Sequence, residues 1–172
     1  MRKQKGFSLI ELLIVVAIIL IIAAIAIPNL LRARIAANES ASVSAIRTVN
    51  TAEVTYATSF PNTGYSANLA NLGGATPCTP AVATACLIDN VLASAIPGSA
   101  GKSGYVYLVT PFVGAGAINT AYTVGASPLT YNQSGVRNFC ANEDGVIRFN
   151  AGAAGSAPIA TTAGCNAFTV LP

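Results

Sequence analysis

Hydrophobic and polar positions divide the chain into contrasting segments, and the first of these is apolar. From Leu12 to Ile27 every residue is Leu, Ile, Val or Ala, and further apolar residues flank this run on both sides. The whole stretch reaches the roughly 20 residues that a helix needs to cross a bilayer. The pattern therefore predicts a membrane-spanning helix over residues 7–31. Pro28 cannot donate a helical hydrogen bond, so a kink or a locally melted turn is expected there.

The following segment, residues 32–60, has the spacing of an amphipathic continuation of the same helix. The apolar stripe comprises Ile35, Val43, Ile46, Val49, Tyr56 and Phe60, and the polar face comprises Ser40, Ser44, Arg47, Thr48, Thr51, Thr55 and Thr58. A helix over the whole of residues 7–58 would be roughly 80 Å long. A domain of this size cannot bury such a length, so the first half must lie in lipid or among neighbouring subunits. Glu53 falls in the apolar stripe, where we expect a rim position or an ion pair.

The sequence pattern of residues 61–172 predicts a small globular domain, the head. The stretch 61–103 is rich in turn signals and is expected to be a loop region, with a short helix possible around Leu87–Ala95. Alternation of the tyrosines and valines after Gly104 predicts a first strand, within a sheet covering about 104–150. Asp144-Gly145 suits a hairpin turn between strands at Arg137–Ala141 and Val146–Phe149.

These elements together predict an α+β fold. A long N-terminal α-helix would pack its amphipathic half on a small antiparallel sheet of three to four strands. The last segment, 150–172, contains too few core residues to order itself and is expected to be a loop tied down by a disulfide.

Four cysteines, Cys78, Cys86, Cys140 and Cys165, all follow the apolar segment. An even number beyond a membrane segment suggests export and disulfide bonds. We favour Cys78–Cys86 and Cys140–Cys165, because each pair would close a loop with little core of its own. The spacing gives no CxxC motif for a redox or zinc site.

Composition excludes several kinds of function. The chain has no histidine, which excludes Ser-His-Asp and Cys-His catalysis and histidine metal sites. Three of the nine basic residues precede Gly6, and the remaining six match the six acidic residues in number. A neutral body gives no support for nucleic-acid binding. We therefore expect no enzyme, no cofactor and no metal site.

The start of the chain contains the most specific signal. A short basic leader ends at Gly6, Phe7 follows, and Glu11 stands at the leading edge of the apolar run. Basic residues before the span favour a cytoplasmic leader and an exported head. A carboxylate in the middle of a bilayer costs roughly 2.5–3.5 kcal/mol on insertion scales, so such residues are usually functional.

The stretch KGFSLIELLIVVAII resembles the amino terminus of type IV prepilins and of the pilin-like subunits of related secretion and uptake machines. The resemblance is specific over roughly residues 1–60, and beyond that it is architectural. It implies a cleaved leader at residues 1–6. It also implies a single-pass precursor in the inner membrane with a periplasmic head, which later becomes part of an extracellular pilus filament.

The resemblance further implies site residues and partners. A membrane aspartyl prepilin peptidase would cleave between Gly6 and Phe7 and methylate the new amine of Phe7. Glu11 would pair with the Phe7 amine of a neighbouring subunit, and Pro28 would mark where the helix loosens in the filament, over about Asn29–Ala37. Identical subunits, an inner-membrane assembly platform and minor pilins are the implied partners. The implied filament serves adhesion, motility or a related surface function.

Other interpretations remain open at this point. Ala24–Ala26 could serve a conventional signal peptidase, and the apolar segment could be a plain anchor of an exported protein. Within the family, the alternative is a pseudopilin of a type II secretion or DNA-uptake machine. That alternative would imply an acid-rich, calcium-binding C-terminal loop, for which Glu143 and Asp144 are the candidates here. A conductive filament lined by Phe7, Tyr56 and Phe60 is a remote possibility.

Overall fold

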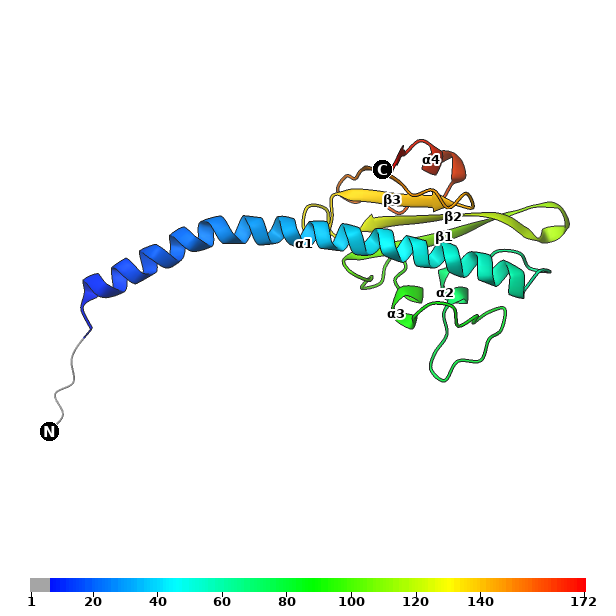
Figure 1. Cartoon of the computed structure of the whole chain (residues 1–172), viewed down its shortest axis with the longest axis horizontal. Coiled ribbons are helices and arrows are strands. Elements are labelled where there is room, and N and C mark those ends of the chain that lie inside the picture. Colours follow the sequence, from blue (N-terminus) through cyan, green and yellow to red (C-terminus); the bar gives the residue numbers. More distant parts are fainter. Residues whose placement is uncertain (1–6) are drawn as a thin grey trace. The chain divides into compact units, whose positions relative to one another are not determined.

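A computed structural model describes residues 7–172 of the chain (Figure 1). The predicted leader and its last residue, Gly6, lie outside the described residues. The chain separates into two compact units, the first ending at Arg34 and the second comprising Ile35–Pro172. We describe each unit by itself and call the second the head.

The long helix α1, Leu9–Ser59, is α-helical throughout, including Pro28. The locally melted turn expected there is absent from this helix. Proline removes one hydrogen bond, but helix propagation is favourable once the helix is nucleated, and the flanking apolar turns keep their own bonds. The kink at Pro28 stays a prediction.

The first unit is an apolar helix whose side chains contact little of the chain. All side chains from Phe7 to Arg34 are exposed except Ala23, which is half-buried. Within the described residues, α1 is the one helix long and apolar enough to cross a membrane. Large contiguous apolar surfaces are rare on soluble monomers and indicate contact with lipid or protein.

The head contains a five-stranded antiparallel sheet in which the strands follow each other in chain order, β1-β2-β3-β4-β5. The strands are β1 Tyr105–Val113, β2 Asn119–Pro128, β3 Arg137–Asn142, β4 Arg148–Ala151 and β5 Thr169–Val170. The antiparallel sheet is confirmed, but the prediction of three to four strands is one strand short. The additional strand, β5, has two residues and lies in the tail that was expected to be loop.

The turn between β3 and β4 lies at the predicted Asp144-Gly145, and Gly145 has the positive φ of 70° that favours glycine there. The following strand begins at Arg148 rather than at Val146. The Asp144 side chain accepts hydrogen bonds from the Val146 amide and the Arg148 guanidinium, so the turn continues beyond Gly145. The hydrogen bond from Arg148 lowers the pKa of Asp144.

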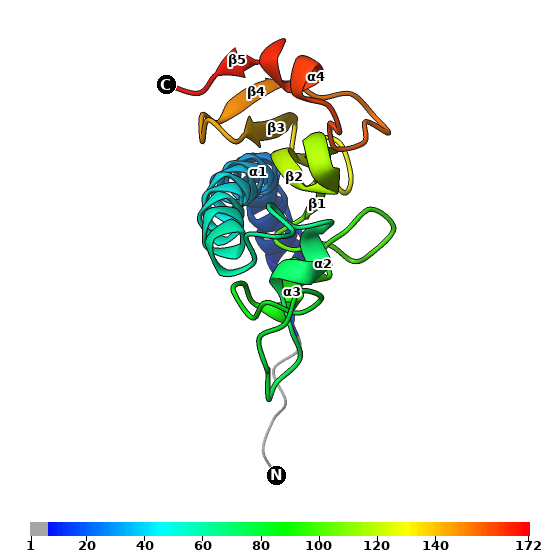
Figure 2. The same cartoon turned by 90° about the vertical axis from the view of Figure 1, so that its right-hand side faces the viewer.

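The core of the head lies between the second half of α1 and the sheet (Figure 2). Ile46, Val49 and Tyr56 of the predicted apolar stripe are fully buried, and Val43 and Phe60 pack at the edge of the same cluster. Every member of the predicted polar face is exposed. The amphipathic pattern is therefore confirmed. Tyr56 keeps its buried hydroxyl bonded, because its Oη donates to the Val82 carbonyl at 2.7 Å.

The head also contains three short α-helices and one 3₁₀ helix: α2 Leu69–Leu72, α3 Asn90–Ala93, α4 Thr162–Asn166 and η1 Ala115–Ala117. The predicted short helix around Leu87–Ala95 corresponds to α3, which Asp89 caps through a 3.0 Å bond from the Leu92 amide. Helix α4 carries Cys165, and its disulfide to Cys140 on β3 bounds the C-terminal segment as predicted. A second disulfide joins Cys78 and Cys86.

Glu53 is fully buried, so the expectation of a rim position or an ion pair is wrong. The Ser66 amide donates to Oε2 at 2.9 Å, and the Ser66 hydroxyl lies 2.6 Å from Oε1 and 3.1 Å from the Asn68 carbonyl. The Ser66 hydroxyl donates to Oε1, so both Glu53 oxygens accept hydrogen bonds from Ser66. Burial raises the pKa of Glu53, and the hydrogen bonds from Ser66 act in the opposite direction.

We expect Glu53→Gln to remove a pH-dependent part of the stability. Because the folded pKa is raised, the stabilisation by Glu53 is complete below its unfolded pKa of about 4.3 and is lost as pH rises through the folded value. Wild type should therefore lose free energy of unfolding relative to Glu53→Gln as pH rises, by about 1.4 kcal/mol per unit of elevation. Urea unfolding of both precursors in detergent across this range measures the difference. Parallel pH profiles would contradict a raised pKa of Glu53.

Candidate processing and assembly site

The helix start places Glu11 beside the segment that carries Phe7. The Ser8 amide donates to Glu11 Oε2 at 3.0 Å, while the Ser8 carbonyl accepts from the Glu11 amide at 3.1 Å and from the Leu12 amide at 3.3 Å. Glu11 thus reaches back over the first turn of α1. A carboxylate there also interacts favourably with the positive end of the helix dipole.

This arrangement contains one of the two reciprocal bonds of a capping box, the bond from the Ser8 amide to the Glu11 carboxylate, which the sequence analysis missed. Its signature is Ser or Thr followed three residues later by Glu or Gln, directly before an apolar run. Ser8 and Glu11 fit this signature, so the signal was present in the sequence. Within a single chain the carboxylate already has one use, namely to satisfy a backbone amide at the start of a helix that is otherwise apolar.

The other predicted processing and assembly residues lie apart from one another. Phe7 directly precedes Ser8 and has 76% of its surface exposed, which leaves it accessible to other molecules. Gly6 belongs to the undescribed segment. Pro28 lies several turns further along α1. Of the predicted set, the structure therefore brings Phe7 and Glu11 close together at the start of α1 and leaves Pro28 distant.

An ion pair that the sequence analysis did not identify fastens α1 to the sheet through a buried carboxylate. Glu39 on α1 accepts from the backbone amides of Val136 and Arg137 at 3.0 and 3.1 Å, and the Arg137 guanidinium donates to it at 2.7 and 2.8 Å. Arg137 also stacks over the rings of Phe139 and Phe149. No short-range pattern indicates such a contact, because Glu39 and Arg137 are distant in sequence.

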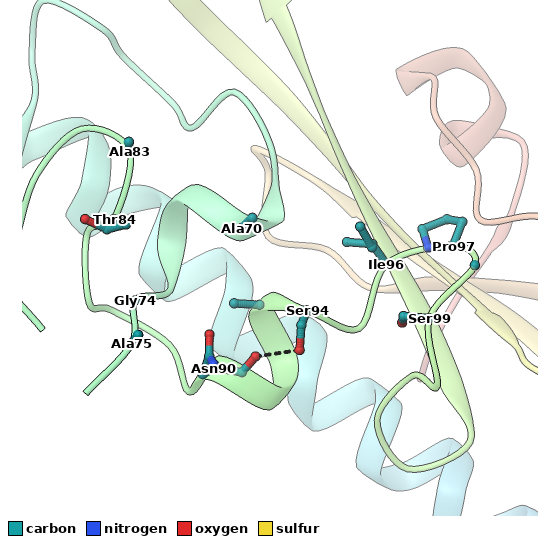
Figure 3. A pocket seen from close by; sticks show the side chains of 12 residues that line it. Ala70, Gly74, Ala75, Ala83, Thr84, Asn90, Ser94, Ile96, Pro97 and Ser99 are labelled. Atoms are coloured by element: carbon teal, nitrogen blue, oxygen red, sulfur yellow. Dashed lines mark hydrogen bonds between the residues drawn. The ribbon is translucent and has the colours of Figure 1, made fainter. Parts of the chain in front are cut away.

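One groove in the head has a lining without residues typical of catalysis. It measures about 600 Å³ and lies between α2, α3 and the segment that follows α3 (Figure 3). Its lining is mostly alanine, glycine and serine, with Thr84, Asn90, Ile96 and Pro97. The part of the chain that the structure describes contains no group of three or more His, Cys, Asp or Glu side chains suited to a metal.

Two of the three aromatic residues considered for conduction, Tyr56 and Phe60, have packing roles in the head. The rings of Tyr56 and Phe60 lie 4.9 Å apart within and beside the core. Contact with the core accounts for both of them.

Comparison with known proteins agrees with this architecture. Residues 1–27 match the family model of the prokaryotic N-terminal methylation motif. The chain is also 41% identical over 134 residues to the type IV wide pilus major component PilA4 of Thermus thermophilus, covering 72% of this chain and 94% of that protein. The chain belongs to the type IV pilin family. No solved structure matches it.

As a type IV pilin, the chain is a structural subunit of a pilus. Its precursor resides in the inner membrane through the apolar half of α1, and it then assembles with other pilin subunits into an extracellular filament. The fold is organised accordingly: the first unit carries the apolar surface and Glu11, whereas the head carries the buried core and both disulfides.

Glu39→Ala should destabilise the pilin head. Two backbone amides would lose their acceptor and Arg137 would lose its partner. We expect a loss of about 2 kcal/mol or more in free energy of unfolding. This loss is smaller than for a fully buried ion pair, because the side chain of Arg137 is 40% exposed.

Urea unfolding of the precursor in detergent measures this loss. The matched control is Lys102→Ala, which breaks the exposed pair with Asp89 and should cost at most about 1 kcal/mol. Equal effects of the two substitutions would contradict the anchoring role of Glu39.

Proposed function

We propose that this pilin is the principal subunit of a surface pilus that serves adhesion or motility, and that Glu11 sets the register of its subunits. The observation that carries the proposal is the position of the Glu11 carboxylate at the free end of an exposed apolar helix. The name of the relative in Thermus thermophilus, a major pilus component, supports the role of principal subunit.

Processing would create the partner of Glu11. We propose that prepilin peptidase cleaves between Gly6 and Phe7 and methylates the new amine, with an inner-membrane assembly platform and minor pilins as later partners. Between Phe7 and Leu31 the sequence has no lysine or arginine. After cleavage, the cation available to a carboxylate in this segment is therefore the amine of Phe7.

The Phe7 amine that Glu11 pairs with would belong to a neighbouring subunit. Opposite unit charges about 4 Å apart attract by about 4 kcal/mol at an effective dielectric constant near 20. Taking both charges out of water costs a similar amount, so the pair would define register more than it would add net stability. The capping bond within the chain is compatible with this role, because Oε2 accepts from Ser8 and a carboxylate has a second oxygen.

The pseudopilin alternative receives no support from the acidic turn. Asp144 is bonded to Arg148 and to the Val146 amide, which is the geometry of a hairpin turn. The two disulfide bonds of the head suit a filament that is exposed to shear and to proteases. Pro28 would be the place where α1 loosens on assembly, over about Asn29–Ala37.

Glu11→Gln separates the capping role of Glu11 from its role in pairing. Glutamine still caps the helix, since a capping box accepts Glu or Gln, but it carries no charge. We expect mass spectrometry to find mature wild type, Glu11→Gln and Glu11→Ala all beginning at N-methylated Phe7. Electron microscopy should find filaments only on wild-type cells.

Two results would contradict this account. A mature wild-type chain beginning at Ile27 would refute the processing site and indicate a conventional signal peptidase. Normal filaments from Glu11→Gln would refute the ion pair while leaving the processing site intact.

A further inference from the structure

Most charged side chains of the head are paired within the chain. Three ion pairs join Lys102 to Asp89, Arg137 to Glu39 and Arg148 to Asp144. Glu53 is buried and bonded to Ser66. Apart from Glu53, this leaves one cation and one carboxylate side chain of residues 35–172 outside any ion pair, namely Arg47 and Glu143. Both are exposed.

Arg47 lies on the polar face of α1 among side chains that are already bonded. The hydroxyls of Thr48, Thr51 and Thr55 each donate to the carbonyl four residues earlier, at 3.1, 3.1 and 2.9 Å. These threonines therefore use their donors within the helix.

Arg47 also lines a cleft of about 350 Å³ with Phe139 and Leu171. The other two charged residues of this cleft, Glu39 and Arg137, neutralise each other. The cleft therefore has surplus positive charge, which comes from Arg47.

Glu143, in contrast to Arg47, gives its surroundings a surplus of negative charge. It precedes Asp144 in the turn between β3 and β4, and Asp144 is occupied by Arg148. Nearby in the same turn, Val146 has 37% of its surface exposed. The turn thus presents an uncompensated carboxylate close to an apolar side chain. This chemistry complements that of the cleft, which combines an uncompensated guanidinium with aromatic and aliphatic walls.

We propose that Glu143 of one pilin subunit binds Arg47 of its neighbour in the filament. The inference rests on the assembly of the chain with copies of itself. When a neighbouring subunit covers the polar face of α1, an unpaired guanidinium there would lose water without compensation, which is costly. A second copy supplies the complementary carboxylate. The contact is head-to-tail, with different surfaces on the two partners, and such contacts repeat into an open helical filament.

Arg32 and Arg34 do not compete for this role before assembly. They directly follow the membrane-spanning segment, where basic side chains lie at the level of the lipid headgroups. Arg47 is more than three helical turns beyond Arg34 and belongs to the head. It is therefore the cation that remains for contacts between heads.

Charge reversal in two separate genes tests the proposal and distinguishes it from a contact within one chain. Subunits carrying Arg47→Glu alone would face like charges at every contact, as would subunits carrying Glu143→Arg alone. Like charges brought together at an interface strongly disfavour binding, so we expect each variant to give at least about tenfold fewer filaments than wild type.

Cells producing both variants together can alternate the two kinds of subunit. Contacts then alternate between the native pair and the reversed pair, in which the carboxylate introduced by Arg47→Glu faces the guanidinium introduced by Glu143→Arg. Opposite charges meet at both kinds of contact. The proposal therefore predicts mixed filaments that contain both variants, in numbers close to wild type. Each variant precursor should have the wild-type free energy of unfolding in detergent.

The matched control is Lys102→Glu, which makes the same charge change as Arg47→Glu at an already paired site and should leave filament numbers unchanged. Normal filaments from either single variant would overturn the proposal. So would loss of filaments that the mixture fails to restore, which would indicate pairing within one chain or a folding defect. Wild-type cells are tested in the same experiment. If they form filaments, processing and assembly work, and a negative result concerns only the contact between Glu143 and Arg47.

Discussion

The structure depends on one constraint: α1 carries far more apolar surface than its own head can cover. The half that begins near Ile35 packs on the sheet and forms the core, whereas the half from Phe7 to Arg34 is exposed almost throughout. Apolar surface removed from water is worth roughly 25 cal/mol per Å². The first half must therefore always lie in another apolar environment, first the bilayer and then contacts with other subunits of the filament. Insertion into the membrane and polymerisation both remove the apolar surface of this half from water.

Carboxylates are few in this chain, and the buried ones hold specific parts together. Glu39 binds two amides and a guanidinium at the start of β3, and Glu53 binds the loop before α2 through Ser66. Each gains partners that compensate for the loss of water. Glu11 is different, because its partner within the chain is a single amide. Its placement at the exposed end of α1 makes sense if a further partner arrives with assembly.

Periodicity predicted the local elements well and the long-range contacts poorly. The apolar stripe, the first strand and the Asp144-Gly145 turn could be predicted because their signals lie within a few residues of each other. The short strand β5 could not, because a two-residue edge strand exists only through its pairing with β4. The roles of Glu39 and Glu53 were missed for the same reason: their partners are supplied by the tertiary fold. The capping-box signature at Ser8 and Glu11 was visible in the sequence and was overlooked.

The most direct test of the central constraint is the solvent accessibility of the middle of the apolar half. Ile18→Cys places a thiol there, and Val113→Cys places one on an exposed part of the head as a reference. A water-soluble maleimide should label Val113→Cys in both membranes and intact filaments, but should leave Ile18→Cys unlabelled in both. Labelling of Ile18→Cys in intact filaments at the rate of Val113→Cys would contradict the account.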